Sequence, residues 1–146
     1  MTREKIVSKV LEVKELKREQ HEAEVRKARE KLSAEQQKLR DLEQSYKRNS
    51  VELTERQMAD MLPVREMDVY YAYLKQIDKQ TLRQKEIIRT QQREVEEREK
   101  GMVEAYKEQR LVEILHGKIV CQEAKQAGQT EQKLMDAEFI MRKTER

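Results

Sequence analysis

The sequence predicts an all-α fold, a long two-helix antiparallel coiled-coil hairpin that spans residues 1–146 as a single unit. The first observation is composition: 42% of the residues are charged, and the chain has three glycines and one proline. The abundant Lys, Arg, Glu, Gln, Leu and Met are all strong helix formers. The second observation is a three-four repeat on both sides of the proline, in which mostly apolar residues recur at alternating spacings of three and four positions. This repeat is typical of coiled coils.

The first helix is expected at about residues 3–58. Thr2 is a suitable N-cap, and Glu4 in the first turn favours the positive end of the helix dipole. The three-four repeat in this segment passes through Val25, Ala28, Leu32, Glu35, Leu39, Leu42, Tyr46, Asn49 and Leu53.

A turn is expected at about residues 59–63, because Pro63 lacks an amide donor and disfavours helix at the residue before it. Proline is accepted at the first position of a helix, so a second helix should cover about residues 64–141. Its repeat passes through Tyr70, Leu74, Ile77, Thr81, Gln84, Ile88, Gln91, Val95, Arg98 and Met102.

The two repeats agree on one fold. If the chain turns back at Pro63, facing residues should have a nearly constant sum of their numbers. The sums lie between about 119 and 121 for the pairs Leu53–Met67, Tyr46–Leu74, Leu42–Ile77, Leu32–Ile88, Val25–Val95, Val10–Leu111 and Ile6–Leu115.

Several expected seam positions are polar, among them Arg18, His21, Asn49, Gln84 and Gln91. Polar seam residues specify register at a cost in stability. We therefore expect a marginally stable hairpin whose end near Arg18 and His21 can adjust its conformation, with faster amide exchange there than near Leu39.

A tail of residues 122–146 is expected to extend past the first helix without a partner in the hairpin. Gly117 and Gly128 weaken helix here by about 1 kcal/mol each relative to alanine. The tail carries an apolar stripe that should either bury itself against another chain or remain mobile, composed of Leu134, Met135, Ala137, Phe139, Ile140 and Met141.

Catalysis and cofactor binding find little support. His21 and His116 should lie at opposite reaches of the hairpin, and Cys121 is the one cysteine, so no disulfide and no metal site is expected. Neither a phosphate-binding loop nor a nucleophile elbow is present. Because 32 basic residues nearly balance 29 acidic ones, nucleic acid is not an expected partner. With no membrane-spanning run or signal peptide, we expect a cytoplasmic protein.

Four of the five tyrosines fall near the expected turn: Tyr46, Tyr70, Tyr71 and Tyr73. A two-helix seam cannot cover the last three together, because they point in different directions around one helix. At least one ring should face water, where an exposed aromatic favours a contact site over simple packing.

The sequence resembles the FliJ family of flagellar type III export proteins over nearly its whole length. The similar stretches are residues 70–80 with the Gln- and Glu-rich segment to Ala105, then Leu39, Leu42 and Tyr46 with Lys47-Arg48, and the tail segment 132–143. The resemblance implies a coiled coil similar to the γ-subunit stalk of rotary ATPases, with no enzymatic activity and no cofactor.

The resemblance also implies the partners: the hexameric flagellar export ATPase, the cytoplasmic domain of the export-gate membrane protein, and export chaperones. The chain would be monomeric alone and peripheral to the inner membrane at the flagellar base. It would enter the pore of the ATPase ring with the end that carries both termini, promote assembly of the ring, and help to cycle the chaperones.

Position by position, the resemblance assigns the gate contact to Leu39, Leu42, Tyr46, Tyr73, Ile77, Gln80 and Gln84. Some relatives carry tyrosine at the position of Leu42, and alanine and histidine at those of Gln80 and Gln84. Contact with the ATPase ring or chaperones is expected at Val10, Val13, Arg18, Leu111, Leu115, Leu134, Met135, Phe139 and Met141.

Three other interpretations stay open at this point. A homodimeric structural coiled coil would pair the termini between molecules and leave the matched sums as coincidence. The stalk of a virulence secretion system, or a subunit of a rotary ATPase, would share the architecture and differ in partner. A nucleic-acid-binding coiled coil would need a steeply salt-dependent affinity for DNA.

Overall fold

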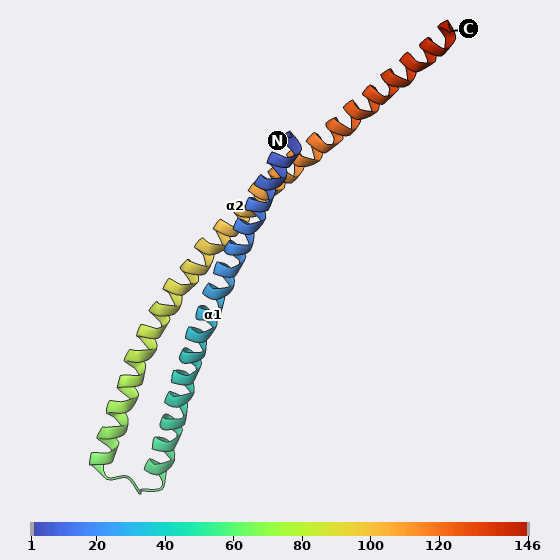
Figure 1. Cartoon of the computed structure of the whole chain (residues 1–146). Coiled ribbons are helices and arrows are strands. Elements are labelled where there is room, and N and C mark those ends of the chain that lie inside the picture. Colours follow the sequence, from blue (N-terminus) through green and yellow to red (C-terminus); the bar gives the residue numbers. More distant parts are fainter. Residues whose placement is uncertain (1, 146) are drawn as a thin grey trace. The chain divides into compact units, whose positions relative to one another are not determined.

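The computed structural model describes residues 2–145 as two long α-helices that pack against each other, with no strand in that range. Helix α1 covers Arg3–Met58 and helix α2 covers Val64–Thr144 (Figure 1). The predicted fold class, a two-helix hairpin, is confirmed. For comparison, the helices were expected at about 3–58 and 64–141.

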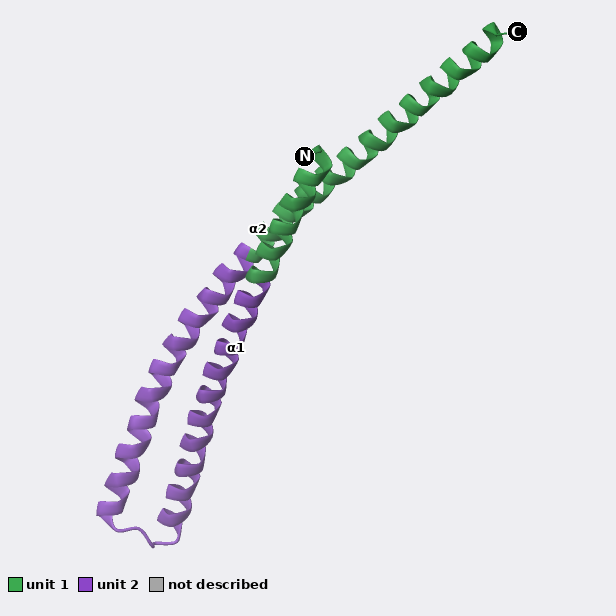
Figure 2. Ribbon diagram, viewed as in Figure 1, with its two compact units in different colours: residues 1–21, 102–146 green, residues 22–101 purple. Residues whose placement is uncertain are grey.

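Contacts divide the chain into two units (Figure 2). The turn unit consists of Glu22–Gly101, which includes the connection between the helices. The terminal unit consists of Met1–His21 and Met102–Arg146. Each unit contains a segment of both helices and therefore has its own seam.

Both helices begin where a local acceptor satisfies their first free amides. The Thr2 hydroxyl accepts a 3.4 Å hydrogen bond from the Lys5 amide, which confirms Thr2 as the N-cap of α1. At the start of α2, the Pro63 carbonyl accepts hydrogen bonds from the amides of Glu66 and Met67. Pro63 therefore immediately precedes the helix instead of occupying its first position.

The connection is closed by a hydrogen-bonded cap at the C-terminus of α1. The Met61 amide donates to the Arg56 carbonyl and the Asp60 amide to the Gln57 carbonyl, the pair of bonds that defines a Schellman motif. This motif needs a left-handed residue, and Asp60 has a φ of 54°. Aspartate tolerates that conformation better than most non-glycine residues. The cap thus ends α1 before the proline.

The core of the turn unit is a row of aliphatic side chains from both helices. Two glutamines of α2 fix its register. The Gln84 side-chain amide donates to the Glu35 carbonyl over 2.9 Å, and that of Gln91 donates to the Ala28 carbonyl over 3.4 Å. Both pairs have the expected sum of residue numbers. The buried residues are Val25, Ala28, Leu53, Leu74, Ile77, Gln84, Ile88 and Val95.

Two residues assigned to the seam of the turn unit are exposed, Tyr46 at 37% and Arg98. The Arg98 guanidinium pairs with Glu94 over 2.9 Å and with Glu24 over 3.1 Å at the edge of the hairpin. Its neighbour Glu99 is the partly buried residue and pairs with Arg29 over 2.9 Å. A long charged side chain at a seam position moves its head group to the rim, where water and opposite charges are available.

The terminal unit corrects two predicted pairs. Ile6, Val10, Leu111 and Leu115 were expected to face each other across the seam, but they are 41–68% exposed. The three-four repeat passes one residue to the side of each of them. It runs through the less exposed Val7, Leu11, Lys14, Arg18 and His21 on α1, and through Ala105, Gln109, Val112, His116 and Ile119 on α2.

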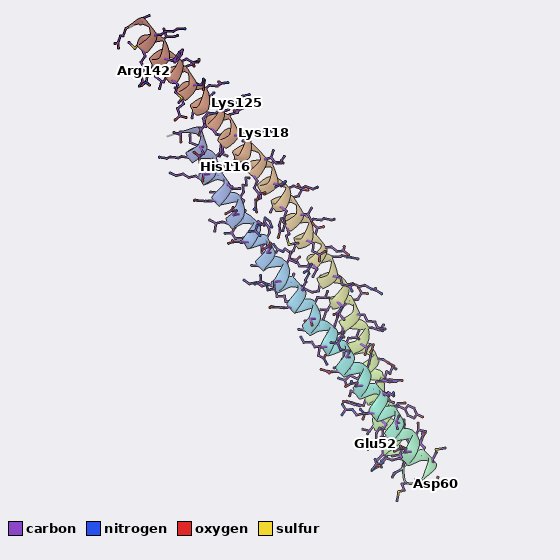
Figure 3. The ribbon with its side chains drawn as sticks, turned by 90° about the vertical axis from the view of Figure 1, so that its right-hand side faces the viewer. Glu52, Asp60, His116, Lys118, Lys125 and Arg142 are labelled. Carbon is purple, nitrogen blue, oxygen red and sulfur yellow. The ribbon has the colours of Figure 1, made fainter. Side chains whose placement is uncertain are left out.

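Beyond Ile119, helix α2 has no part of α1 beside it (Figure 1). His116 and Lys118 lie next to the start of α1, whereas Lys125 and Arg142 lie on a single helix (Figure 3). Every described residue after Ile119 is exposed except Glu123, which is partly buried. The tail is therefore a lone helix within the terminal unit.

Candidate interaction surfaces

Three sets of exposed side chains are candidates for binding other proteins: one in the turn unit and two in the terminal unit. The turn-unit set contains the seven residues expected to contact the export gate. Tyr46, Tyr73 and Gln80 are exposed, and Leu39 and Leu42 are half-buried. The remaining two, Ile77 and Gln84, are 2% and 7% exposed and lie in the seam. In this conformation Ile77 can only support a contact surface from beneath, and Gln84 presents little of its own surface.

Gln84 joins the two helices beside this surface. Its amide nitrogen donates to both the backbone carbonyl and the carboxylate of Glu35. The hydrogen bond from Gln84, together with the nearby Lys38 ammonium at 3.3 Å, lowers the pKa of Glu35 below its usual range. Both groups favour the charged carboxylate over the neutral acid. The contact holds the two helices in one register beneath the exposed residues.

A groove of about 470 Å³ opens along one side of the hairpin next to this contact. It brings together three of the seven expected gate residues, Leu42, Gln80 and Gln84. Sequence reasoning did not identify its other walls, because charged residues at edge positions are common on any solvated helix. Those walls are Lys38, Asp41 and Arg83.

The tyrosines that open α2 differ in exposure. Tyr70 is partly buried; its hydroxyl accepts a 3.1 Å hydrogen bond from Arg56, whose guanidinium lies 5.8 Å from the ring centroid. Tyr71 and Tyr73 are 53% and 47% exposed. The expectation that at least one ring faces water is therefore confirmed.

The terminal unit carries an apolar patch on one side of the hairpin, which we call the terminal patch. Its members are aliphatic and 41–68% exposed: Ile6, Val10, Val13, Leu111 and Leu115. Each helix contributes a stripe, because residues three and four apart share a face.

An ion pair shows that the two stripes adjoin. Glu108 accepts a 3.0 Å hydrogen bond from Lys14, and its pKa is lowered first by Lys14 and also by the charge of Lys17. Val10 lies one heptad before Lys17, and Leu115 lies one heptad after Glu108. In an antiparallel pair, Val10 and Leu115 must then occupy the same edge of the hairpin.

Arg18, the one charged residue expected in the ATPase contact, is partly buried in the same unit. Its guanidinium is 5.4 Å from the centroid of the Tyr106 ring, and its side chain is 24% exposed. A guanidinium over a tyrosine face is attracted by the ring quadrupole. Arg18 thus fills the seam where aliphatic residues are missing, and the neighbouring patch remains apolar.

The third set is the stripe on the tail. Its large apolar side chains expose 60–67% of their surface, and Phe139 lies 5.9 Å from the Lys143 ammonium. A lone helix with such side chains gains little from burial by itself, so its apolar surface is available to a partner. The exposed large side chains are Leu134, Met135, Phe139, Ile140 and Met141.

Residues with potential chemistry are dispersed. Within residues 2–145 no three His, Cys, Asp or Glu side chains are close enough to hold a metal ion. Cys121, the residue before the tail, is exposed. His21 and His116 were expected at opposite reaches of the hairpin, but both belong to the terminal unit. In the described part of the chain, no helix is long and apolar enough to cross a membrane.

Comparison with known proteins identifies the family. The flagellar FliJ protein family matches residues 5–146, which is nearly the whole chain. No curated protein and no solved structure matches the sequence. The hairpin, the tyrosines near its turn and the apolar tail agree with the family resemblance described above. The chain belongs to the flagellar FliJ protein family and is a component of the flagellar protein export apparatus.

Proposed function

We propose that this chain is a non-enzymatic, stalk-like component that links the hexameric export ATPase to the export gate. The terminal patch and the tail bind the ATPase ring and promote its assembly, and they also receive export chaperones. The surface around Tyr46 and Tyr73 binds the cytoplasmic domain of the gate protein. Through these partners the chain is peripheral to the inner membrane at the flagellar base.

The observation that carries this proposal is that the chain has two exposed apolar surfaces, each in a different unit. The tyrosine surface belongs to the turn unit, whereas the terminal patch and tail belong to the terminal unit. Exposed apolar side chains on a chain that is 42% charged favour protein contacts. Two such surfaces in different units favour two partners over one.

The test is the hydrolysis rate and the assembly state of the cognate export ATPase with substoichiometric amounts of this chain. We expect stimulation to saturate at about one chain per six ATPase subunits, the stoichiometry that a central stalk implies. Leu134→Ser with Met141→Ser should weaken this stimulation, because it removes apolar contacts from the tail. Normal stimulation by that variant would argue against the tail as the ATPase contact.

Leu82→Ser is the matched control. Leu82 is 65% exposed, like Leu134 at 63%, but lies in the turn unit. It should leave stimulation unchanged. If neither stimulation nor ring binding occurs with the wild-type chain, the homodimeric coiled coil becomes the better interpretation. Sedimentation would then show a dimer that dissociates only on dilution.

A further inference from the structure

Charge is distributed unevenly along this nearly neutral chain. Residues 26–50 of α1 and 69–93 of α2 contain 14 Lys and Arg against six Asp and Glu, a net charge of +8, whereas the whole chain carries +3. The two segments lie side by side in the turn unit, since Gln84 and Gln91 bond across to Glu35 and Ala28. They form one strongly basic section of the hairpin, which we call the basic band.

The groove beside Gln84 opens within the basic band. Its floor includes Leu42, and its rim includes Lys38 and Arg83. Tyr73 lies one heptad before Gln80 and Ile87 one heptad after it, so all three share one edge of α2. Tyr73 and Ile87 are each 47% exposed. The groove is therefore bordered by apolar side chains at heptad spacing on α2, by the two basic groups and by one acidic residue, Asp41.

We infer that this groove binds an amphipathic helix with acidic flanks, which lies between α1 and α2 as a third strand. The groove offers an apolar edge at heptad spacing on α2 and Leu42 on α1, which suits a third helix that presents apolar side chains at the same spacing. The net charge of +8 selects glutamate and aspartate beside those anchors. The inference rests on the proposed function in one respect: the helix belongs to the cytoplasmic domain of the gate protein.

The composition of the groove favours a protein helix over a polyanion. A nucleic acid or an anionic membrane would use the basic groups but leave Leu42, Tyr73 and Ile87 without a role. The acidic helix uses both kinds of side chain. Ile87, Lys38 and Arg83 are then specificity-determining residues in addition to those expected from the family.

The experiment measures the affinity of the full chain for the purified cytoplasmic domain of the gate protein. The charge variant is Lys38→Gln with Arg83→Gln, and its control is Arg40→Gln with Lys85→Gln. The control pair removes the same charge from exposed residues of the band that do not line the groove. The apolar variant is Ile87→Ser, matched by Leu82→Ser. All four replace exposed side chains, so circular dichroism should show unchanged helices.

We expect the groove variants to raise Kd by about tenfold each, and the controls by less than about threefold. If the charge variant and its control lower the affinity equally and Ile87→Ser has no effect, the partner is attracted by net charge alone. That result would overturn the proposed binding in the groove. If Tyr46→Ala lowers the affinity and the groove variants do not, the proposed gate contact stands and this inference is wrong. If wild type binds only duplex DNA or phosphatidylglycerol vesicles, both the gate contact and the helix are wrong.

Discussion

The two units follow the same three-four repeat with different side chains. The turn unit contains eight of the ten buried residues of the described chain, and seven of them are aliphatic. The terminal unit contains the other two, Ala105 and Ile119, while Lys14, Arg18 and His116 occupy neighbouring seam positions. A repeat by itself sets the register of a hairpin. The burial of apolar surface at its positions sets how firmly each part is held.

The largest expected effect is from Ile77→Ala, which removes a side chain that is 2% exposed in the turn unit. Replacing a buried isoleucine with alanine costs about 2–5 kcal/mol through lost transfer energy and a cavity. Urea unfolding followed by circular dichroism should show this loss. Leu111→Ala, at a site 68% exposed in the terminal unit, should change stability by less than about 0.5 kcal/mol. Equal effects at the two sites would contradict the comparison.

Hydrogen exchange compares the units without any substitution. Amides at residues 4–21 should exchange at least about tenfold faster than those at 25–53, because local opening is easier where less apolar surface is buried. Mass spectrometry of peptic fragments from the free protein can resolve the two stretches. If the amides of residues 4–21 are as well protected from exchange as those of 25–53, the interpretation that the terminal unit adjusts to a partner is wrong.

The sequence was sufficient for the fold because two repeats and one proline constrain each other. The sums that predicted Leu42 opposite Ile77 also describe the hydrogen bonds of Gln84 and Gln91. Prediction failed where aliphatic residues lie next to the repeat instead of in it. Val10 and Leu111 were placed in the seam because they are apolar, but helix geometry puts their neighbours Leu11 and Val112 there.

The candidate surfaces were harder to predict than the fold. The prediction that at least one tyrosine faces water was confirmed, because it depended only on the directions in which side chains point around one helix. The groove was missed because its walls come from both helices, and Lys38, Asp41 and Arg83 resemble other charged residues in the sequence. Ile77 and Gln84 were assigned to a contact by family resemblance, although their burial makes them part of the seam.

The tail allows a smaller test of local order in the terminal unit. Nothing lies within 4 Å of the position that a Cβ would occupy on Gly128, so alanine fits without a clash. Gly128→Ala should stabilise the helix locally by about 1 kcal/mol. Slower amide exchange at residues 122–140 would show it, with exchange at 25–53 unchanged as the internal control. An unchanged tail would mean that its helix is already held by other contacts.

The smallest effect is a pH dependence in the turn unit. The hydrogen bond from Gln84 lowers the pKa of Glu35 in the folded state, so the folded state binds a proton less readily than the unfolded state. The contact therefore stabilises the hairpin above the ordinary carboxyl pKa of 4.5 and is lost as the pH falls through the lowered value. The midpoint of thermal unfolding should decrease over that acid range.

Glu35→Gln isolates this contribution, because glutamine cannot titrate. The variant should lose less stability than wild type on acidification, but some loss should remain. Glu108 and Glu113 in the terminal unit also have lowered pKa values, caused first by hydrogen bonds from Lys14 and Gln109 respectively. Identical acid slopes for variant and wild type would show that the Gln84 contact does not contribute. A slope abolished by this one change would instead assign the acid sensitivity to the turn unit alone.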